Sequence, residues 1–178
     1  ASGLTQMVRW IEFKAPVANL VALDGQVRAL GAEFMHERRE QDLCLDFPDG
    51  TLVLREPEGA SADLLTYRRE SLGELQSAEV EVAEVGAPRE VGAMLRGRFG
   101  VRTEVEKTRR TFQWRRTQIQ LDQVFGLGMF VELQTLVAGD DDEAAKSELR
   151  EALTTLGIDV HTSEIRSYAD MLLEQKTP

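Results

Sequence analysis

Alternation of charged and apolar residues along several segments constrains the fold of this chain most strongly. Near the N-terminus, Trp10, Glu12 and Lys14 occupy one set of alternate positions, and Ile11 and Phe13 occupy the other. Successive side chains of a β-strand point to opposite faces, so this spacing predicts a strand with one polar and one apolar face. The same alternation recurs in the segments 107–115, 118–122 and 129–134. We therefore expect a core built largely from strands whose two faces differ in polarity.

Turn residues divide the chain into closely spaced strand signals with helices between or after them. The predicted strands are 7–15, 34–47, 51–56, 63–70, 77–85, 101–115, 118–125 and 129–137. Helices are predicted from Pro16 to Gly31, from Pro88 onward, from Asp140 to Gly157, and over 167–174. Because most connections between the strands are short, antiparallel pairing is expected. The pattern predicts an α+β fold with eight antiparallel strands and flanking helices.

The charged strand faces have two structural interpretations. In the first, the sheet is open and its polar faces are solvated, which is the commonest cause of such alternation. In the second, the sheet closes into a barrel, helices cover its apolar outside, and the charged face lines a wet interior. A charged interior would need a charged ligand and a metal to offset the desolvation of its side chains. Alternation alone favours the solvated sheet.

The charged residues on these faces nevertheless suit metal–phosphate chemistry. The candidate oxygen ligands for Mg²⁺ or Mn²⁺ are Glu12, Asp122 and Glu132. The candidate binders of phosphate oxygens are Lys14, Arg55, Arg68, Lys107 and Arg109. Acids and bases in one cavity would allow a metal to bridge phosphate oxygens while cations neutralise the charge that develops in the transition state.

Five segments, in chain order, carry the motifs of one known family. They are Trp10-Ile11-Glu12-Phe13-Lys14, Val53-Leu54-Arg55-Glu56, Leu65-Thr66-Tyr67-Arg68, Val105-Glu106-Lys107-Thr108-Arg109, and Leu121-Asp122 followed by Gly126-Leu127-Gly128 and Glu132. Together they resemble the CYTH superfamily, the triphosphate tunnel metalloenzymes, whose first motif is Glu-x-Glu-x-Lys. The ending Arg166-Ser167-Tyr168 is similar to that of the class IV adenylyl cyclase branch. Trp10 and Gln134 depart from the family pattern, because both stand where a glutamate is expected.

The resemblance implies that residues 1–178 form one domain, an eight-stranded antiparallel closed β-tunnel with flanking helices. It implies that the tunnel binds a triphosphate with Mg²⁺ or Mn²⁺. The metal ligands would be Glu12, Asp122 and Glu132, and the phosphate would be bound by Lys14, Arg55, Arg68, Lys107 and Arg109. Arg166 and Tyr168 would close one mouth of the tunnel. No residue is assigned as the catalytic base.

Three functions fit this resemblance. The first is a class IV adenylyl cyclase, in which the ribose 3′-oxygen of ATP attacks in line and expels pyrophosphate to give cAMP. The second is a phosphohydrolase that cleaves inorganic or thiamine triphosphate with water. The third is a non-catalytic polyanion-binding protein, because Trp10 and Gln134 replace the expected glutamates. We rank the two enzymes together above the binding protein, and the cyclase first.

The overall charge limits the partners of the chain. Its 21 Lys and Arg residues against 31 Asp and Glu residues give a formal net charge of −10. Such a surface should repel nucleic acid and anionic membranes, so neither is an expected partner. No apolar run approaches the roughly 18 residues of a membrane span, and no signal peptide is recognisable, so a cytoplasmic location is expected. Oligomeric state stays open, with a homodimer among the options, and the five candidate cations predict a basic channel inside an acidic protein.

Overall fold

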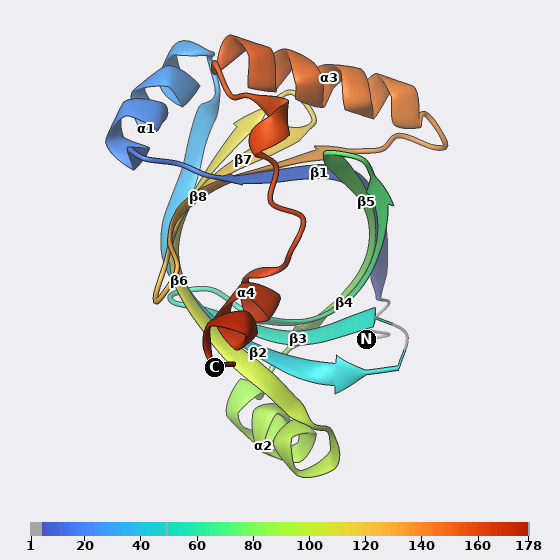
Figure 1. The fold of residues 1–178 in the computed structure, drawn as a ribbon. Helices are drawn as coiled ribbons and strands as arrows, with labels where there is room; N and C mark the ends of the chain where they lie inside the picture. The colour runs from blue at the N-terminus through green and yellow to red at the C-terminus, as the bar shows by residue number, and fades with distance from the viewer. Residues whose placement is uncertain (1–4, 49, 178) are drawn as a thin grey trace.

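The computed structural model describes residues 5–48 and 50–177. In this part of the chain, the strands close into a barrel in the order β1-β5-β4-β3-β2-β6-β7-β8, and every neighbouring pair is antiparallel (Figure 1). The strands are β1 (Gln6–Pro16), β2 (Glu33–Phe47), β3 (Gly50–Pro57), β4 (Ala62–Leu72), β5 (Leu75–Val85), β6 (Val101–Trp114), β7 (Thr117–Val124) and β8 (Gly128–Leu136). The predicted eight-stranded antiparallel barrel is confirmed.

Helices lie on the outside of the barrel and at one of its ends. They are α1 (Leu20–Ala29), α2 (Pro88–Arg98), α3 (Asp142–Thr155) and α4 (Tyr168–Gln175), with a short 3₁₀ helix, η1 (Val160–Thr162), between the last two. Helix α1 packs against β7, α3 against β1 and β8, α2 against β2 and β3, and α4 against β6. The segment between η1 and α4 passes across the opening of the barrel (Figure 1). None of the helices in the described ranges is long and apolar enough to cross a membrane.

The main apolar core lies outside the barrel wall, under α1 and α3. Ile11 and Phe13 are almost completely buried there, and they belong to one cluster with Phe112 of β6 and Leu149 of α3. Burying a side chain of this size contributes about 1.5–3 kcal/mol. The apolar faces of β1, β6, β7 and β8 therefore point outward under helices, and their charged faces point inward. This is the closed-barrel interpretation of the alternation.

The first helix begins later than the sequence pattern predicts. Pro16 is not in its first turn but is the last residue of β1, where it lies opposite Phe130 of β8. The helix starts at Leu20, and the Asn19 side chain accepts a hydrogen bond of 3.0 Å from the backbone N–H of Ala22. Asparagine satisfies one of the free N–H groups of a helix start, which proline cannot do with its side chain. The cap therefore sets the helix start.

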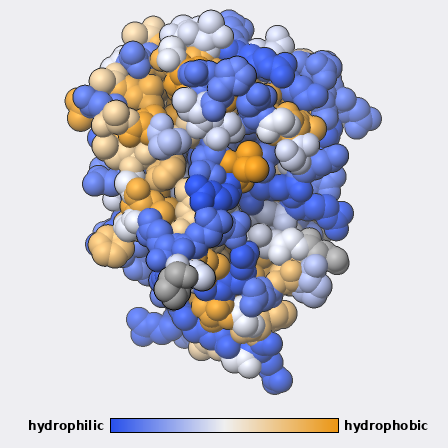
Figure 2. Space-filling model, viewed as in Figure 1, coloured by the Kyte–Doolittle hydropathy of each residue, from blue (hydrophilic) through white to orange (hydrophobic). Residues whose placement is uncertain are grey.

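The face of the molecule that carries the barrel opening is mostly polar. Figure 2 shows hydrophilic residues over much of this face, with apolar residues gathered towards the side of α1. Hydrophilic side chains also surround the segment that crosses the opening. A ligand that enters here therefore meets a polar surface before it reaches the interior.

Candidate functional site

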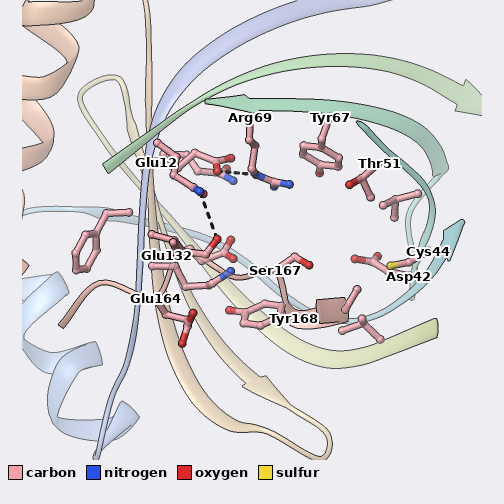
Figure 3. A pocket seen from close by; sticks show the side chains of 18 of the residues that line it. Glu12, Asp42, Cys44, Thr51, Tyr67, Arg69, Glu132, Glu164, Ser167 and Tyr168 are labelled. Atoms are coloured by element: carbon pink, nitrogen blue, oxygen red, sulfur yellow. Dashed lines mark hydrogen bonds and ion pairs between the residues drawn. The ribbon is translucent and has the colours of Figure 1, made fainter. Parts of the chain in front are cut away.

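A cavity inside the barrel receives charged side chains of both signs. Its lining cations are Lys14, Arg55, Arg69, Lys107 and Arg109, and its lining carboxylates are Glu12, Asp42, Glu74, Glu132 and Glu164. Figure 3 shows Glu12, Arg69 and Glu132 on one side of the cavity, and Tyr67, Thr51 and Cys44 on another. The strands supply most of the lining, and the segment 163–169 supplies the rest.

A first cluster of buried charges is centred on Asp42 of β2. The guanidinium of Arg55 donates two hydrogen bonds to its carboxylate, at 2.9 and 2.8 Å, and Lys107 Nζ donates a third at 2.9 Å. Lys107 Nζ also lies 3.3 Å from Glu40 Oε2. Burial alone would raise the pKa of Asp42, but the charges of Arg55 and Lys107 outweigh it and hold this pKa well below its usual range. Asp42 therefore keeps Arg55 and Lys107 fixed in the barrel.

A second cluster joins β6, β7, β8 and α4. Arg109 donates two hydrogen bonds of 2.7 Å to Asp122 and one of 2.9 Å to Glu132. The Tyr168 hydroxyl donates to Asp122 Oδ2 at 2.7 Å. Burial would raise the pKa of Asp122, but Arg109 lowers it below the usual value, whereas burial raises the pKa of the Tyr168 hydroxyl. Asp122 thus orients the phosphate-binding candidate Arg109 and anchors the first residue of α4.

A third cluster surrounds Glu12 of β1. The Trp10 indole N–H donates to Glu12 Oε1. Arg69 Nε donates to Glu12 Oε2 at 3.0 Å (Figure 3). The guanidinium carbon of Arg69 lies 4.4 Å from the centre of the Tyr67 ring. The tryptophan that stands in place of a family glutamate therefore binds the remaining glutamate of the same motif.

Lys14 differs from the other cations of the cavity. Its ammonium lies 4.8 Å from the centre of the Tyr168 ring. In residues 5–48 and 50–177, its Nζ makes no hydrogen bond or salt bridge to a carboxylate. Burial lowers the pKa of Lys14, and the nearby charge of Glu132 offsets this in part. Its three N–H donors therefore remain for a ligand.

The segment 163–167, which we call the strap, closes one side of the cavity. Its Glu164 backbone N–H donates to the Lys14 carbonyl at 2.7 Å, and Gln76 Nε2 donates to the Ile165 carbonyl at 3.3 Å. Hydrogen bonds from Arg166 lower the pKa of Glu164 to about 2. The strap is therefore fixed to β1 and to β5, and it leads directly into Tyr168.

The structure brings most of the predicted site residues together. The cavity is lined by Glu12, Lys14, Arg55, Lys107, Arg109, Glu132 and Tyr168. Asp122 is fully buried and reaches the site only through its bonds to neighbours. Arg166 lies beside the mouth and pairs with Glu164 and Glu174 instead of lining the cavity. The roles assigned to these residues remain predictions.

Arg68 is placed outside the barrel, and Arg69 occupies the inner position expected of it. The Arg68 side chain is 71% exposed and lies 3.9 Å from Glu79 on the outer surface. On β4 the apolar residues Leu65 and Tyr67 face inward, which is the reverse of the pattern on β1. The inward-facing arginine of β4 is therefore Arg69, whereas the motif Leu65-Thr66-Tyr67-Arg68 had pointed to Arg68. The rule taken from β1, that the charged positions face inward and the apolar ones outward, fails on this strand.

Several charged residues of the site were missed by sequence reasoning. They are Glu40, Asp42, Arg69, Glu74 and Glu164. The segment 36–42 is polar at every position, so alternation does not show which residues face inward. The register of β2 against β6 resolves this, because Glu40 lies opposite Lys107. No signal in the sequence alone separates the two faces here.

The cavity lining is formally neutral, which corrects the expectation of a basic channel. Five cations are matched by five carboxylates in the lining, and Glu40 and Asp122 add negative charge beneath it. An unpaired buried charge costs several kcal/mol in desolvation. Four of the five cations are accordingly held by carboxylates: Arg55, Arg69, Lys107 and Arg109. A ligand can therefore contact only the N–H groups that these ion pairs do not use.

The carboxylates of the cavity do not form a ready-made metal site. Among the described residues, no three acidic, histidine or cysteine side chains converge as metal ligands would. Both oxygens of Glu12 already accept hydrogen bonds, and Asp122 is not part of the lining. Mg²⁺ is usually held by one or two carboxylates together with substrate phosphate oxygens. Of the three predicted metal ligands, Glu12 and Glu132 line the cavity, and their role as ligands remains a prediction.

Comparison with known proteins places the chain in a family. The family model for the CYTH domain matches residues 9–168. No curated protein matches the chain. The PH1012 protein of Pyrococcus horikoshii has a similar structure, with a TM-score of 0.81 and 21% identity over 90% of this chain and 98% of that one.

Two further solved structures have names that refer to activities. A Vibrio parahaemolyticus protein described as a candidate adenylate cyclase is 25% identical, with a TM-score of 0.75 over 92% of this chain and 97% of that one. A Hippeastrum protein described as a candidate adenylyl cyclase with a dominant triphosphatase activity is 18% identical, with a TM-score of 0.64 over 93% and 95%. Because the family model covers most of its residues, this protein belongs to the CYTH domain family.

Proposed function

We propose that this protein binds a triphosphate inside the barrel and cleaves one of its phosphoanhydride bonds. The observation that carries the proposal is the convergence of five cationic side chains on one enclosed cavity, from strands β1, β3, β4 and β6. A triphosphate needs several cations at once, because its charge is spread over many oxygens. The first candidate reaction is that of a class IV adenylyl cyclase acting on ATP, and the second is hydrolysis of inorganic or thiamine triphosphate.

The buried pairs explain how the cations would act. Asp42 and Asp122 each bind one edge of an arginine guanidinium, that of Arg55 and of Arg109, through two parallel hydrogen bonds. The remaining N–H groups of Arg55 and Arg109 are then held in place before the ligand binds. Donors that are fixed in advance stabilise charge on the phosphate oxygens without reorganising during the reaction. Lys14 adds an ammonium that forms no ion pair with any carboxylate of residues 5–48 and 50–177.

A divalent metal completes this proposal. Enzymes of this family generally use divalent metals. We place Mg²⁺ or Mn²⁺ on Glu12 and Glu132, together with oxygens of the triphosphate. When bound, the metal would neutralise negative charge on the phosphate chain and leaving group. Glu12 would have to exchange one of its bonds to Trp10 or Arg69 for this role.

The two reactions differ in the nucleophile. In the cyclase reaction, the ribose 3′-oxygen loses its proton and bonds to the α-phosphorus while the bond to pyrophosphate breaks. In hydrolysis, water supplies the oxygen and the proton, and phosphate or pyrophosphate leaves. The same cations of the cavity would serve both reactions, and the similarity to the Hippeastrum protein, whose description names both activities, supports keeping both.

A product assay separates the candidates. The protein is incubated with ATP, inorganic triphosphate and thiamine triphosphate, each with Mg²⁺, with Mn²⁺ and with EDTA. Formation of cAMP with pyrophosphate identifies a cyclase, whereas phosphate release from inorganic triphosphate identifies a hydrolase. If no product forms from any of the three with either metal, the enzyme proposal is rejected.

A non-catalytic binding protein is the alternative that Trp10 favours. Its indole N–H occupies one oxygen of Glu12, and Gln134 presents an amide where the family has a carboxylate. Tight triphosphate binding without turnover, persisting in the double variant Trp10→Glu and Gln134→Glu, would support this alternative. Turnover by the unmodified protein would exclude it.

A further inference from the structure

A groove on the outside of the barrel has no part in the proposed function. It lies between α2 and the C-terminal end of α4, over β2 and β6 (Figure 1). Its volume is about 630 Å³, so it is large enough to take in an aromatic side chain of another molecule. The apolar residues of its lining include Leu43, Ala93, Phe125 and Leu172, and none of these four lines the cavity inside the barrel.

Phe125 stands at the rim of this groove and is 78% exposed. The turn that carries it is fixed, because its backbone N–H donates to the Glu106 carbonyl at 2.9 Å. At the next residue, Gly126, a Cβ would lie 3.3 Å from Leu172, so the turn packs closely against α4. Single exposed apolar residues are ordinary, but an exposed apolar surface that continues into a groove marks an interaction site. Phe125 is therefore a fixed apolar projection beside an apolar hollow.

The outer surface of the groove is neutral, although the protein is strongly acidic. Its cations are Arg89, Arg96 and Lys176, and its carboxylates are Glu56, Glu104 and Glu106; Asp42 also belongs to the lining, but Arg55 and Lys107 match its charge inside the barrel. The net charge of the chain is −10, so two copies repel each other over most of their surfaces. At the groove this repulsion is absent. The groove is therefore a place where two copies can meet.

Unpaired charges of both signs lie around the groove. Arg96 pairs with Glu104, but among residues 5–48 and 50–177 no ion pair involves Arg89, Lys176 or Glu56. In a two-fold symmetric contact, each copy meets the same surface of the other. The free cations of one copy then face the free carboxylate of the other, and the ring beside one groove enters the other groove. The surface is thus complementary to itself in both charge and shape.

We propose that two copies of the chain associate about a two-fold axis, with Phe125 of each copy inserted between α2 and α4 of the other. Each ring would lie against the other copy's Leu43, Ala93 and Leu172. A buried aromatic side chain surrounded by a polar rim is the arrangement that carries most of the binding energy in protein interfaces. The contact uses no residue of the strap, and it stands whether or not the protein cleaves a triphosphate.

Analytical ultracentrifugation tests the inference. The unmodified protein should sediment as a dimer at micromolar concentrations. Phe125→Ser removes the inserted ring and Ala93→Trp fills the groove, and each should raise the dissociation constant at least about tenfold. Met94→Trp is the matched control and should leave the dissociation constant unchanged, because Met94 is 70% exposed on α2 but does not line the groove. A monomer throughout the micromolar range, or a dimer that Phe125→Ser and Ala93→Trp leave intact, would overturn the inference.

A mixture of the two interface variants shows whether the ring and the groove meet. A two-fold dimer has two equivalent contacts, and each variant alone loses both of them. A mixed pair keeps one, because Phe125 of the Ala93→Trp variant can enter the open groove of the Phe125→Ser variant. The dissociation constant of the mixed pair should therefore lie between that of the unmodified dimer and those of the single variants. If the mixture associates no more tightly than either variant alone, the inference is wrong. All three positions are exposed, so the variants should keep the fold, which circular dichroism checks.

Discussion

Asp122 is the most deeply buried carboxylate of the site, and we expect its replacement to lower the stability of the protein strongly. It accepts two hydrogen bonds from Arg109 and one from Tyr168, and its exposed fraction is 0%. Asp122→Asn would leave the buried guanidinium paired only with Glu132. Breaking a buried pair in this way costs about 3–5 kcal/mol, which urea unfolding at pH 7 would measure.

The control is Glu151→Gln, which breaks the exposed ion pair with Arg115. Exposed pairs are usually worth about 0–1 kcal/mol, so this variant should unfold at nearly the same urea concentration as the unmodified protein. If both variants lost similar amounts of unfolding free energy, the buried pair of Arg109 with Asp122 would contribute no more to stability than an exposed pair does, and the prediction would be wrong.

The Asp42 cluster predicts how stability depends on pH. Arg55 and Lys107 hold the pKa of Asp42 below the value of about 4 that an unfolded aspartate has. The folded state therefore binds this proton less readily, and the stabilisation is complete at neutral pH and lost as the pH falls below about 4. The difference in unfolding free energy between the unmodified protein and Asp42→Asn should be largest at pH 7 and should shrink towards pH 3. A difference that stays constant over this range would contradict the assignment.

Replacing Lys14 should weaken triphosphate binding without unfolding the protein. No carboxylate of the described residues depends on it through a hydrogen bond or salt bridge, so Lys14→Met leaves no buried acid without its partner. Its three donors face the cavity, and their removal should reduce affinity for triphosphate at least tenfold. Titration calorimetry measures the affinity, and the thermal midpoint serves as the control and should change by only a few degrees. Unchanged affinity would remove Lys14 from the site.

At the scale of the element, α1 and the turn after it give a matched pair of glycines. Gly25 lies within the helix and Gly31 lies just after it, and a Cβ at either position would meet nothing within 4 Å. They differ in backbone conformation, because Gly31 has φ +91°. Gly25→Ala should stabilise the protein by about 0.5–1 kcal/mol, whereas Gly31→Ala should destabilise it by about 1 kcal/mol or more. Thermal unfolding measures both, and shifts of the same sign would contradict the argument.

The strands also show how far sequence could predict this structure. Alternation on β1 identified Glu12 and Lys14 as neighbours on one face, because the helices that bury the opposite face impose a consistent rule. It failed on β4, where apolar side chains face inward and Arg69 takes the place of Arg68. The ion pair of Asp42 with Arg55 depends on the register of two strands, which local sequence does not determine. The family motifs therefore identified most of the cations that line the cavity. The carboxylates that pair with them could be identified only from the register of the strands.

At the scale of the whole molecule, charge is distributed differently from the expectation of an acidic shell around a basic channel. The net charge is −10, yet the lining of the cavity carries equal numbers of cations and carboxylates. Around the mouth, Arg166 is already paired with Glu164 and Glu174. Long-range steering therefore opposes an anionic ligand, and attraction begins only at close contact with the cations inside.

This distribution predicts an unusual dependence of binding rate on salt, provided that the proposed triphosphate site is correct. Raising the ionic strength from 0.01 to 0.15 M shortens the Debye length from about 30 to about 8 Å. Screening should weaken the repulsion between the acidic surface and inorganic triphosphate, so the association rate constant measured by stopped flow should rise several-fold. Glu174→Gln removes one negative charge at the mouth and should raise the rate at low salt while reducing its dependence on salt. A rate constant that falls as salt is added would instead show that the mouth attracts anions from a distance, against the charge arrangement described above.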